Sequence, residues 1–237
     1  MSFLINPYAL AVTSSGLSFV ASTGGGNTTT DPYTISLAGL GIQPGDIVIV
    51  VAGDINNGTS QASITCSGNN NGAYTTNLAT SEGSDSWDCT FKSFYKIQGG
   101  TVDTQLSIGR NSGCYSSSCA VHVWRGANAT PMDATTTSAT GTNTGRGDPP
   151  AITPVTTGAV VLACGVGAQP PGGSAFTVPS GMSNGQSNYT DGGVSGCGIF
   201  IASYAWTSGS YDPAAWTGGT DDVRASWIAH TIALKPA

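Results

Sequence analysis

The chain has 237 residues, of which only 8% are charged, and it carries 34 glycines and a net charge of −6. Seven Lys and Arg residues are too few for a phosphate-neutralising patch, so we expect neither nucleic-acid binding nor attachment to an anionic membrane. No apolar run approaches the roughly 20 residues of a membrane-spanning helix. Short apolar blocks joined by many turns predict an all-β protein.

The first eight residues are predicted to form an N-terminal arm ahead of a folded domain that spans residues 9–237. Phe3, Leu4 and Ile5 are large apolar residues with no obvious local partner. Such residues are a liability on a free protein but can anchor it in an assembly, so we expect the arm to contact another subunit. The segment lacks the basic and long apolar regions of a secretory signal peptide.

Apolar or alternating blocks of strand length follow the arm. They are Leu10–Thr13, Leu17–Ala21, Tyr33–Leu37, Ile47–Ala52, Ser63–Cys66, Trp87–Ile97, Thr104–Ile108 and Cys119–Trp124. Gly- and Asn-rich turns separate them, and no segment shows the sustained apolar period of a helix. The sequence therefore predicts essentially no long helix.

The densest apolar block, Ile47–Ala52, is predicted to be a central strand buried on both faces. It has an echo in Val160–Cys164, and a glycine precedes each block at a turn, Gly45 in the first case and Gly158 in the second. Further blocks recur in the same order and at nearly the same offset, so that Tyr95 has its counterpart in Tyr204 and His122 in His230. Repeated blocks at nearly one offset indicate a duplication.

The segment 140–150 has no apolar block and separates two related halves, at about 9–139 and 151–237. The halves could form two stacked sheets of one sandwich or two small sandwiches. We favour one sandwich, because the last strand would need a partner from the first half. The predicted fold is therefore an antiparallel β-sandwich, jelly-roll-like, with an internal duplication.

Several turn motifs occur in a fixed order along the chain. They are Pro44-Gly45-Asp46, Arg125-Gly126 followed by Thr130-Pro131-Met132-Asp133, Pro179-Ser180-Gly181-Met182, and the ending Ala233-Leu234-Lys235-Pro236. In this order they resemble a β-sandwich module of phage virion proteins and bacterial surface proteins, over residues 30–237. The resemblance implies a structural protein of a virion, and it supplies no catalytic residues.

Six cysteines depart from that pattern and suggest three local disulfides. The predicted pairs are Cys114–Cys119, Cys66–Cys89 and Cys164–Cys197, because the last two pairs span comparable intervals of the two halves. Such bridges would imply maturation in an oxidising medium, as for a particle released from its host. The alternative is that Cys164, inside an apolar strand, is a buried thiol.

Titratable residues give no specific catalytic signature. On strand parity His122 and His230 face apolar neighbours, which favours core histidines over metal ligands. Glu82, Asp85, Asp88 and Asp103 could converge as the carboxylates of a glycan-cleaving enzyme, but solvated turn residues are the favoured interpretation. Two further hypotheses are a calcium site in the loop 219–222 and adhesion through Arg146-Gly147-Asp148.

Aromatic side chains are the candidates for ligand contacts. Trp87 and Trp216 lie near turns and are expected to be exposed, where they could stack on a sugar or join a subunit interface. Trp124, Trp206 and Trp227 lie in repeated strands and are expected in the core.

These observations favour a phage virion structural protein, in capsid decoration or in a fibre, spike or tail. It would bind other virion proteins and its own copies, with a host surface glycan as a further partner, and it would need no cofactor. A free carbohydrate-binding module is the first alternative, and a glycan-cleaving enzyme is the second.

Overall fold

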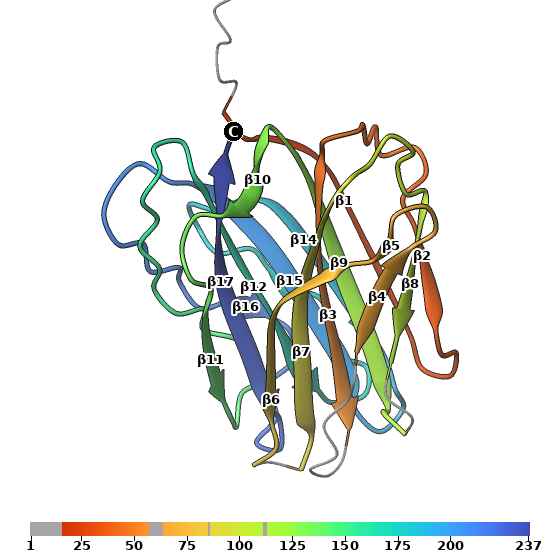
Figure 1. Ribbon diagram of the computed structural model, residues 1–237. Coiled ribbons are helices and arrows are strands. Elements are labelled where there is room, and N and C mark those ends of the chain that lie inside the picture. Colours follow the sequence, from red (N-terminus) through yellow and green to blue (C-terminus); the bar gives the residue numbers. More distant parts are fainter. Residues whose placement is uncertain (1–15, 57–63, 85, 111–112) are drawn as a thin grey trace, which may run out of the picture.

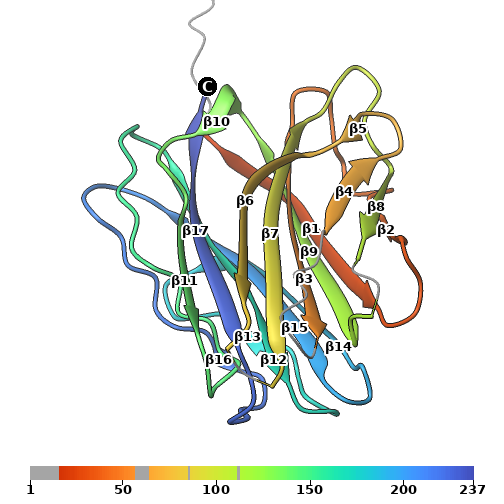
Figure 2. The same cartoon turned by 60° about the horizontal axis from the view of Figure 1, so that its bottom comes forward.

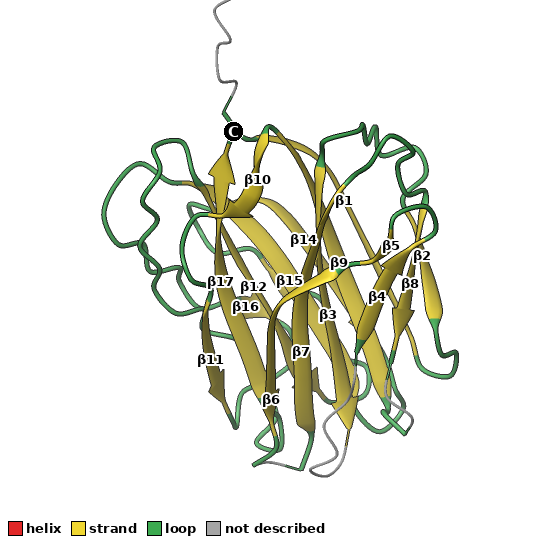
Figure 3. Cartoon of the chain, in the orientation of Figure 1, coloured by secondary structure: helices red, strands yellow, loops and turns green. Residues whose placement is uncertain are grey.

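The computed structural model describes residues 16–56, 64–84, 86–110 and 113–237, and within these ranges it contains strands and no helix (Figures 1 and 3). The predicted all-β class is therefore confirmed. The predicted arm with Phe3, Leu4 and Ile5, and the block Leu10–Thr13, lie outside the described residues. In the part that is described, no helix is long and apolar enough to cross a membrane.

The first half of the chain builds one five-stranded sheet with the order β1-β9-β3-β7-β6. Its strands are β1 (Ser18–Asn27), β3 (Ile47–Asn56), β6 (Thr75–Glu82), β7 (Asp88–Ile97) and β9 (Ser116–Arg125). All neighbours pair antiparallel. We call this the first sheet.

The second sheet has the order β10-β17-β12-β15-β14, and β11 also pairs with β17. Its strands are β10 (Ala127–Met132), β11 (Thr137–Gly141), β12 (Val160–Gln169), β14 (Ser183–Thr190), β15 (Gly196–Ala205) and β17 (Trp227–Pro236). The last strand, β17, thus pairs with β10 and β11. β10 ends before the predicted break at residues 140–150, and β11 ends at the start of that break. The two sheets stack face to face as one sandwich (Figure 1), in agreement with the predicted antiparallel β-sandwich.

The duplication is visible in the strand order. β3 and β12 are the central strands of their sheets, every residue in both is buried, and each pairs with two ten-residue strands. The preceding glycines, Gly45 and Gly158, have positive φ angles of 89° and 83° in matching turns, a conformation that glycine adopts without steric cost. The prediction of central strands in equivalent places is therefore confirmed.

The histidine and tyrosine offsets do not mark equivalent positions. His122 pairs with Ile49, and the residue at the same place after the second glycine is Leu162, which pairs with Ile232 and not with His230. His230 therefore lies two residues before the equivalent position, Ile232, on the same face of its strand. Positions in the two halves are equivalent when they pair with equivalent residues of the central strands. The strand register therefore identifies equivalent positions better than a recurring residue type does.

A third layer covers the outer face of the first sheet. The connections from β1 to β3, from β3 to β6 and from β7 to β9 contribute to it. Its strands are β2 (Tyr33–Ser36), β4 (Thr65–Gly68), β5 (Gly72–Ala73) and β8 (Gln105–Gly109), in the order β2-β8-β4-β5. Ile35, Leu106 and Ile108 pack there against Val48 and Val50 of β3. This layer explains why β3 is apolar on both faces.

The outer face of the second sheet has a thinner cover. Only β13 (Phe176–Thr177) and β16 (Thr217–Gly218) pair over it among the described residues (Figure 2), together with an isolated bridge between Ile152 and Tyr211. Phe176 and Trp216 pack there on Phe200. The second half therefore repeats the layer plan of the first with shorter strands.

The turn motifs of the resemblance lie at points that hold this fold together. Asp46 is buried and accepts hydrogen bonds from Arg125 Nε at 2.8 Å and Nη2 at 2.9 Å, so the Pro-Gly-Asp and Arg-Gly turns are joined to each other. Asp133 accepts hydrogen bonds from the backbone of Val155 and Thr156 at 2.6 and 3.0 Å. These residues therefore serve the architecture.

The two central strands approach each other closely at Gly53. A Cβ atom at Gly53 would lie 2.5 Å from Val166 Cγ2 and 2.8 Å from its Cβ, on the strand of the opposite sheet. Val166 is fully buried and β-branched, so it has little freedom to move away.

Gly53→Ala is predicted to lower the free energy of unfolding by about 1–3 kcal/mol, the usual cost of an overpacked core. Adding Val166→Ala should recover part of that loss, so the double variant should be more stable than the sum of the single effects implies. Denaturant unfolding measures this, with Gly100→Ala as control, because a Cβ there meets no atom within 4 Å. Strict additivity would mean that the sheets do not meet at this point.

Candidate functional site

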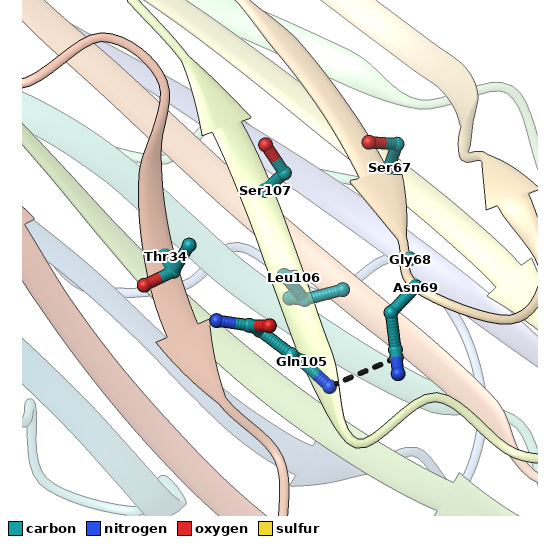
Figure 4. A pocket seen from close by; sticks show the side chains of 7 residues that line it. All are labelled: Thr34, Ser67, Gly68, Asn69, Gln105, Leu106 and Ser107. Atoms are coloured by element: carbon teal, nitrogen blue, oxygen red, sulfur yellow. Dashed lines mark hydrogen bonds between the residues drawn. The ribbon is translucent and has the colours of Figure 1, made fainter.

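A shallow depression lies on the exposed face of the third layer (Figure 4). Its lining residues are Thr34 of β2, Gln105, Leu106 and Ser107 of β8, and Ser67, Gly68 and Asn69 at the end of β4. Thr34, Ser107 and Ser67 pair across the strands and form one polar row, above the buried Leu106. A Cβ atom at Gly68 would collide with the Asp103 carboxylate on the inner side of β4, so glycine permits close packing there.

The depression is too small to enclose an organic ligand. Its volume is about 110 Å³, whereas ligand pockets usually measure roughly 300–1,000 Å³. Asn69 is also held in place, because its Oδ1 accepts hydrogen bonds from the backbone of Thr104 and Gln105 at 3.0 and 3.1 Å. The patch is a flat, uncharged hydrogen-bonding surface.

The disulfide predictions are corrected by the structure, because none of the six cysteines is bridged and all are buried. Cys66 lies in the core under the third layer, whereas Cys89 lies in the core between the two main sheets. The first sheet therefore stands between the two sulfurs. The sequence interval between two cysteines does not show which face of a strand each occupies.

The other two predicted pairs are not bridged either. Cys164 pairs with Ile201, four residues from Cys197, which corresponds to about 13 Å. A disulfide needs Cα atoms within about 7 Å. Cys114 precedes β9 and its Sγ accepts a hydrogen bond from Arg110, whereas Cys119 lies within β9 in the core under the third layer, and neither is bridged. Without these bridges, the cysteines give no support for an oxidising compartment.

The buried thiols are unreactive by their environment. Burial raises the pKa of Cys119 to about 12 and that of Cys164 still further. Arg110 Nε donates a hydrogen bond to Cys114 Sγ at 3.0 Å, but burial outweighs this contact and raises the pKa of Cys114 to about 11. Thiols of this kind remain protonated and are poor nucleophiles.

The predicted carboxylate cluster is not assembled. Glu82 and Asp88 lie at the β6–β7 turn, whereas Asp103 follows the far end of β7, a ten-residue strand about 33 Å long. Glycoside hydrolysis needs two carboxylates within roughly 5–9.5 Å. Asp85 lies outside the described residues.

The two loop motifs are occupied by contacts within the chain. Arg146 of the Arg-Gly-Asp tripeptide pairs with Asp221 at 2.9 Å, and Gly147 is buried, with its carbonyl accepting a hydrogen bond from the backbone of Trp216. Asp222 pairs with Arg224 at 2.8 Å. Both acidic residues of the loop 219–222 therefore face guanidinium groups, and no group of three or more metal-ligating side chains occurs among the described residues.

Both histidines lie in the core between the sheets, as their strand parity predicts. His230 contacts Thr80 Oγ1 at 3.0 Å and Ser93 Oγ at 3.3 Å across the sandwich. The ring centroids of His122 and Phe19 lie 5.2 Å apart. Neither ring nitrogen of His122 has a hydrogen bond of ordinary geometry to a described residue, and the Asn184 backbone raises the pKa of His122 by less than burial lowers it. Because burial disfavours the charged imidazole, the pKa of each histidine is lowered to about 3.

Acid should therefore destabilise the protein before its carboxylates titrate. In the unfolded chain histidine has a pKa near 6.5, so between about pH 6.5 and pH 3 the unfolded state binds protons that the folded state does not, and stability falls as pH falls. From pH 7 to pH 5 the free energy of unfolding should drop by about 2 kcal/mol for each histidine. Denaturant unfolding at pH 7, 6 and 5 measures this slope.

A variant with His122→Gln and His230→Gln is the control for this prediction. It should be less stable at pH 7, because two packed side chains change, but its stability should depend much less on pH over the same range. An equally steep slope in the double variant would show that other groups cause the acid sensitivity.

The two tryptophans predicted to lie at the surface are buried, which corrects that prediction. Trp87 is 5% exposed, forms a bridge with Ala225, and carries the Arg224 guanidinium 4.2 Å above its ring. Trp216 is 1% exposed and packs 4.1 Å from Phe200. Both lie in turns, but these turns fold over the sheets and bury the rings.

Half-buried aromatic rings instead gather at the end of β15. Tyr204, Trp206 and Tyr211 pack on Ile152 and Val161 at the outer face of the second sheet. We call these three residues the aromatic shelf. The core positions predicted for Trp206 and Trp227 are wrong, because both side chains are only half-buried. The signal that could have identified the shelf is the cluster of aromatic residues around an exposed Ser-Gly-Ser turn.

The chain matches none of the protein-family models, curated proteins or solved structures with which it was compared.

Proposed function

We propose that the chain is a structural protein of a phage particle, and that it works by binding other virion proteins and its own copies. The observation that supports this proposal is the structural role of the turn residues on which the resemblance to virion modules is based. Asp46 and Arg125 join two of these turns, and Asp133 holds a third segment. Because these turn residues hold the domain together, the resemblance extends to the whole domain and is not limited to a few surface loops.

The chemistry of the surface supports a binding role. Charged residues are only 8% of the chain, and the depression on the third layer is shallow and lined mainly by uncharged polar side chains. Interfaces between proteins are depleted in charge at their centre and combine apolar contact with hydrogen bonds. The particle would carry the protein outside the host cell, with the arm of residues 1–8 as its anchor.

Fractionation of the native source tests the proposal. Particles purified on a density gradient should contain the chain in many copies, and electron microscopy should show its three-layered sandwich at repeating positions. Recovery of the chain only in particle-free fractions would contradict membership of a particle.

A deletion of Met1–Tyr8 tests the anchor separately. The truncated chain should stay folded and monomeric but fail to join the particle. If the truncated chain joins normally, the arm has no role in assembly, and the particle proposal is unaffected.

A carbohydrate-binding module is the second candidate, and the aromatic shelf is the observation that favours it. The third candidate, a glycan-cleaving enzyme, has less support, because Asp103 lies at the opposite end of β7 from Glu82 and Asp88.

A further inference from the structure

The aromatic shelf is a built feature of the second half. The rings of Tyr204 and Tyr211 are parallel, with an angle of 3° between their planes and 3.9 Å between their centroids. Trp206 Nε1 donates a hydrogen bond to Gly209 O at 2.9 Å, and the Trp206 backbone N–H donates to Ala159 O. Because the edge of the indole is already bonded within the chain, its face is the part that remains for a ligand.

The internal duplication explains why these rings are only half-buried. Ile97 pairs with Ile47 and Ala205 pairs with Val160, the residues at which β3 and β12 begin. Ile97 and Ala205 therefore occupy equivalent rungs, so the counterparts of Tyr204 and Trp206 are Lys96 and Gln98. In the first half both counterparts contact the end of the β4–β5 hairpin.

The contacts in the first half are specific. Lys96 Nζ donates a hydrogen bond to Ala73 O at 3.2 Å, and Gln98 Nε2 donates one to Tyr74 Oη at 3.1 Å. The connection between β3 and β6 (57–74) is longer than the one between β12 and β14 (170–182). The shorter connection forms no second strand like β5, and the shelf lies where the hairpin is missing.

We propose that the aromatic shelf binds a neutral glycan by stacking the apolar faces of sugar rings on Trp206 and the tyrosine pair. Aromatic faces carry negative partial charge that attracts the C–H groups of a pyranose, and tyrosine also offers a hydroxyl. The exposed side chains of Thr207, Ser208 and Ser210 surround the shelf with further hydroxyl groups.

A glycan fits the shelf better than a second copy of the chain. A fully buried aromatic side chain covers about 150–250 Å², and each of these three rings is already partly covered by the chain. The remaining area is a few hundred Å² at most, well below the roughly 800 Å² per partner of a stable protein interface. Asp212 is the one carboxylate in the segment 204–212, which suits an uncharged ligand.

Titration of the full chain with hexasaccharides of glucose, N-acetylglucosamine and mannose tests the inference, with tryptophan fluorescence and saturation-transfer NMR as readouts. At least one of the three should bind, with saturation passing to its ring C–H protons. Trp206→Ala should weaken binding about tenfold or more, the contribution expected of one aromatic stacking contact. Trp227→Ala is the matched control, because Trp227 is also half-buried but packs near Phe200, and it should leave affinity unchanged.

Ser210→Arg is a second test that does not touch the core, because Ser210 is exposed and a long charged side chain there would cover the shelf. It should also reduce affinity. The inference is overturned if none of the three hexasaccharides binds at millimolar concentration, or if folded Trp206→Ala binds as tightly as the parent chain. It is equally overturned if the parent self-associates and Trp206→Ala is monomeric, since the shelf would then be an interface. These measurements use the isolated chain, so their outcome is independent of membership of a particle.

Discussion

The structure depends on one constraint, which is that the central strands β3 and β12 are apolar on both faces. Ile47, Ile49 and Val51 of β3 face the second sheet, whereas Val48 and Val50 face outward. A sheet with two apolar faces needs a cover on each side. The inner faces cover each other and form the main core, and the connections between strands supply the outer covers.

The two halves meet the same constraint in different ways. In the first half the connections form a four-stranded layer, and in the second they form two short strands, an isolated bridge and packed loops. Aromatic rings such as Phe176 and Trp216 compensate for the missing strands by covering more surface per residue. Phe176 and Trp216 do not cover the aromatic shelf, which belongs to a separate cluster. The second half therefore has a partly exposed aromatic surface that the first half lacks.

Sequence patterns predicted the features that depend on local chemistry. The β-branched run Ile47–Val51 indicated a strand buried on both faces, and Gly45 and Gly158 marked equivalent turns because their positive φ angles favour glycine. Strand parity placed His122 and His230 in the main core, where His230 contacts Ser93 of the opposite sheet. These conclusions need only the alternation of strand side chains and the conformational limits of turns.

Features that depend on how distant segments cover one another could not be predicted. Cys66 and Cys89 are separated by a whole sheet, which their spacing in the sequence does not show. The turn near Trp87 favoured exposure, but residues 224–226 from the far end of the chain bury this side chain. The strand-like block that ends at Trp206 favoured burial, yet the connection that would cover this ring is too short.

The central claim is that the strands up to Arg125 and the strands from Ala127 onward each form one sheet of a single shared core. Two fragments, residues 1–125 and 126–237, test it most directly, because the cut falls between β9 and β10. Each fragment alone should show no cooperative unfolding and no near-ultraviolet circular dichroism, since its apolar inner face has no partner. Equimolar fragments refolded together should recover the spectrum and the cooperative unfolding of the intact chain. A fragment that folds cooperatively alone as a monomer would contradict the account and indicate two independent domains.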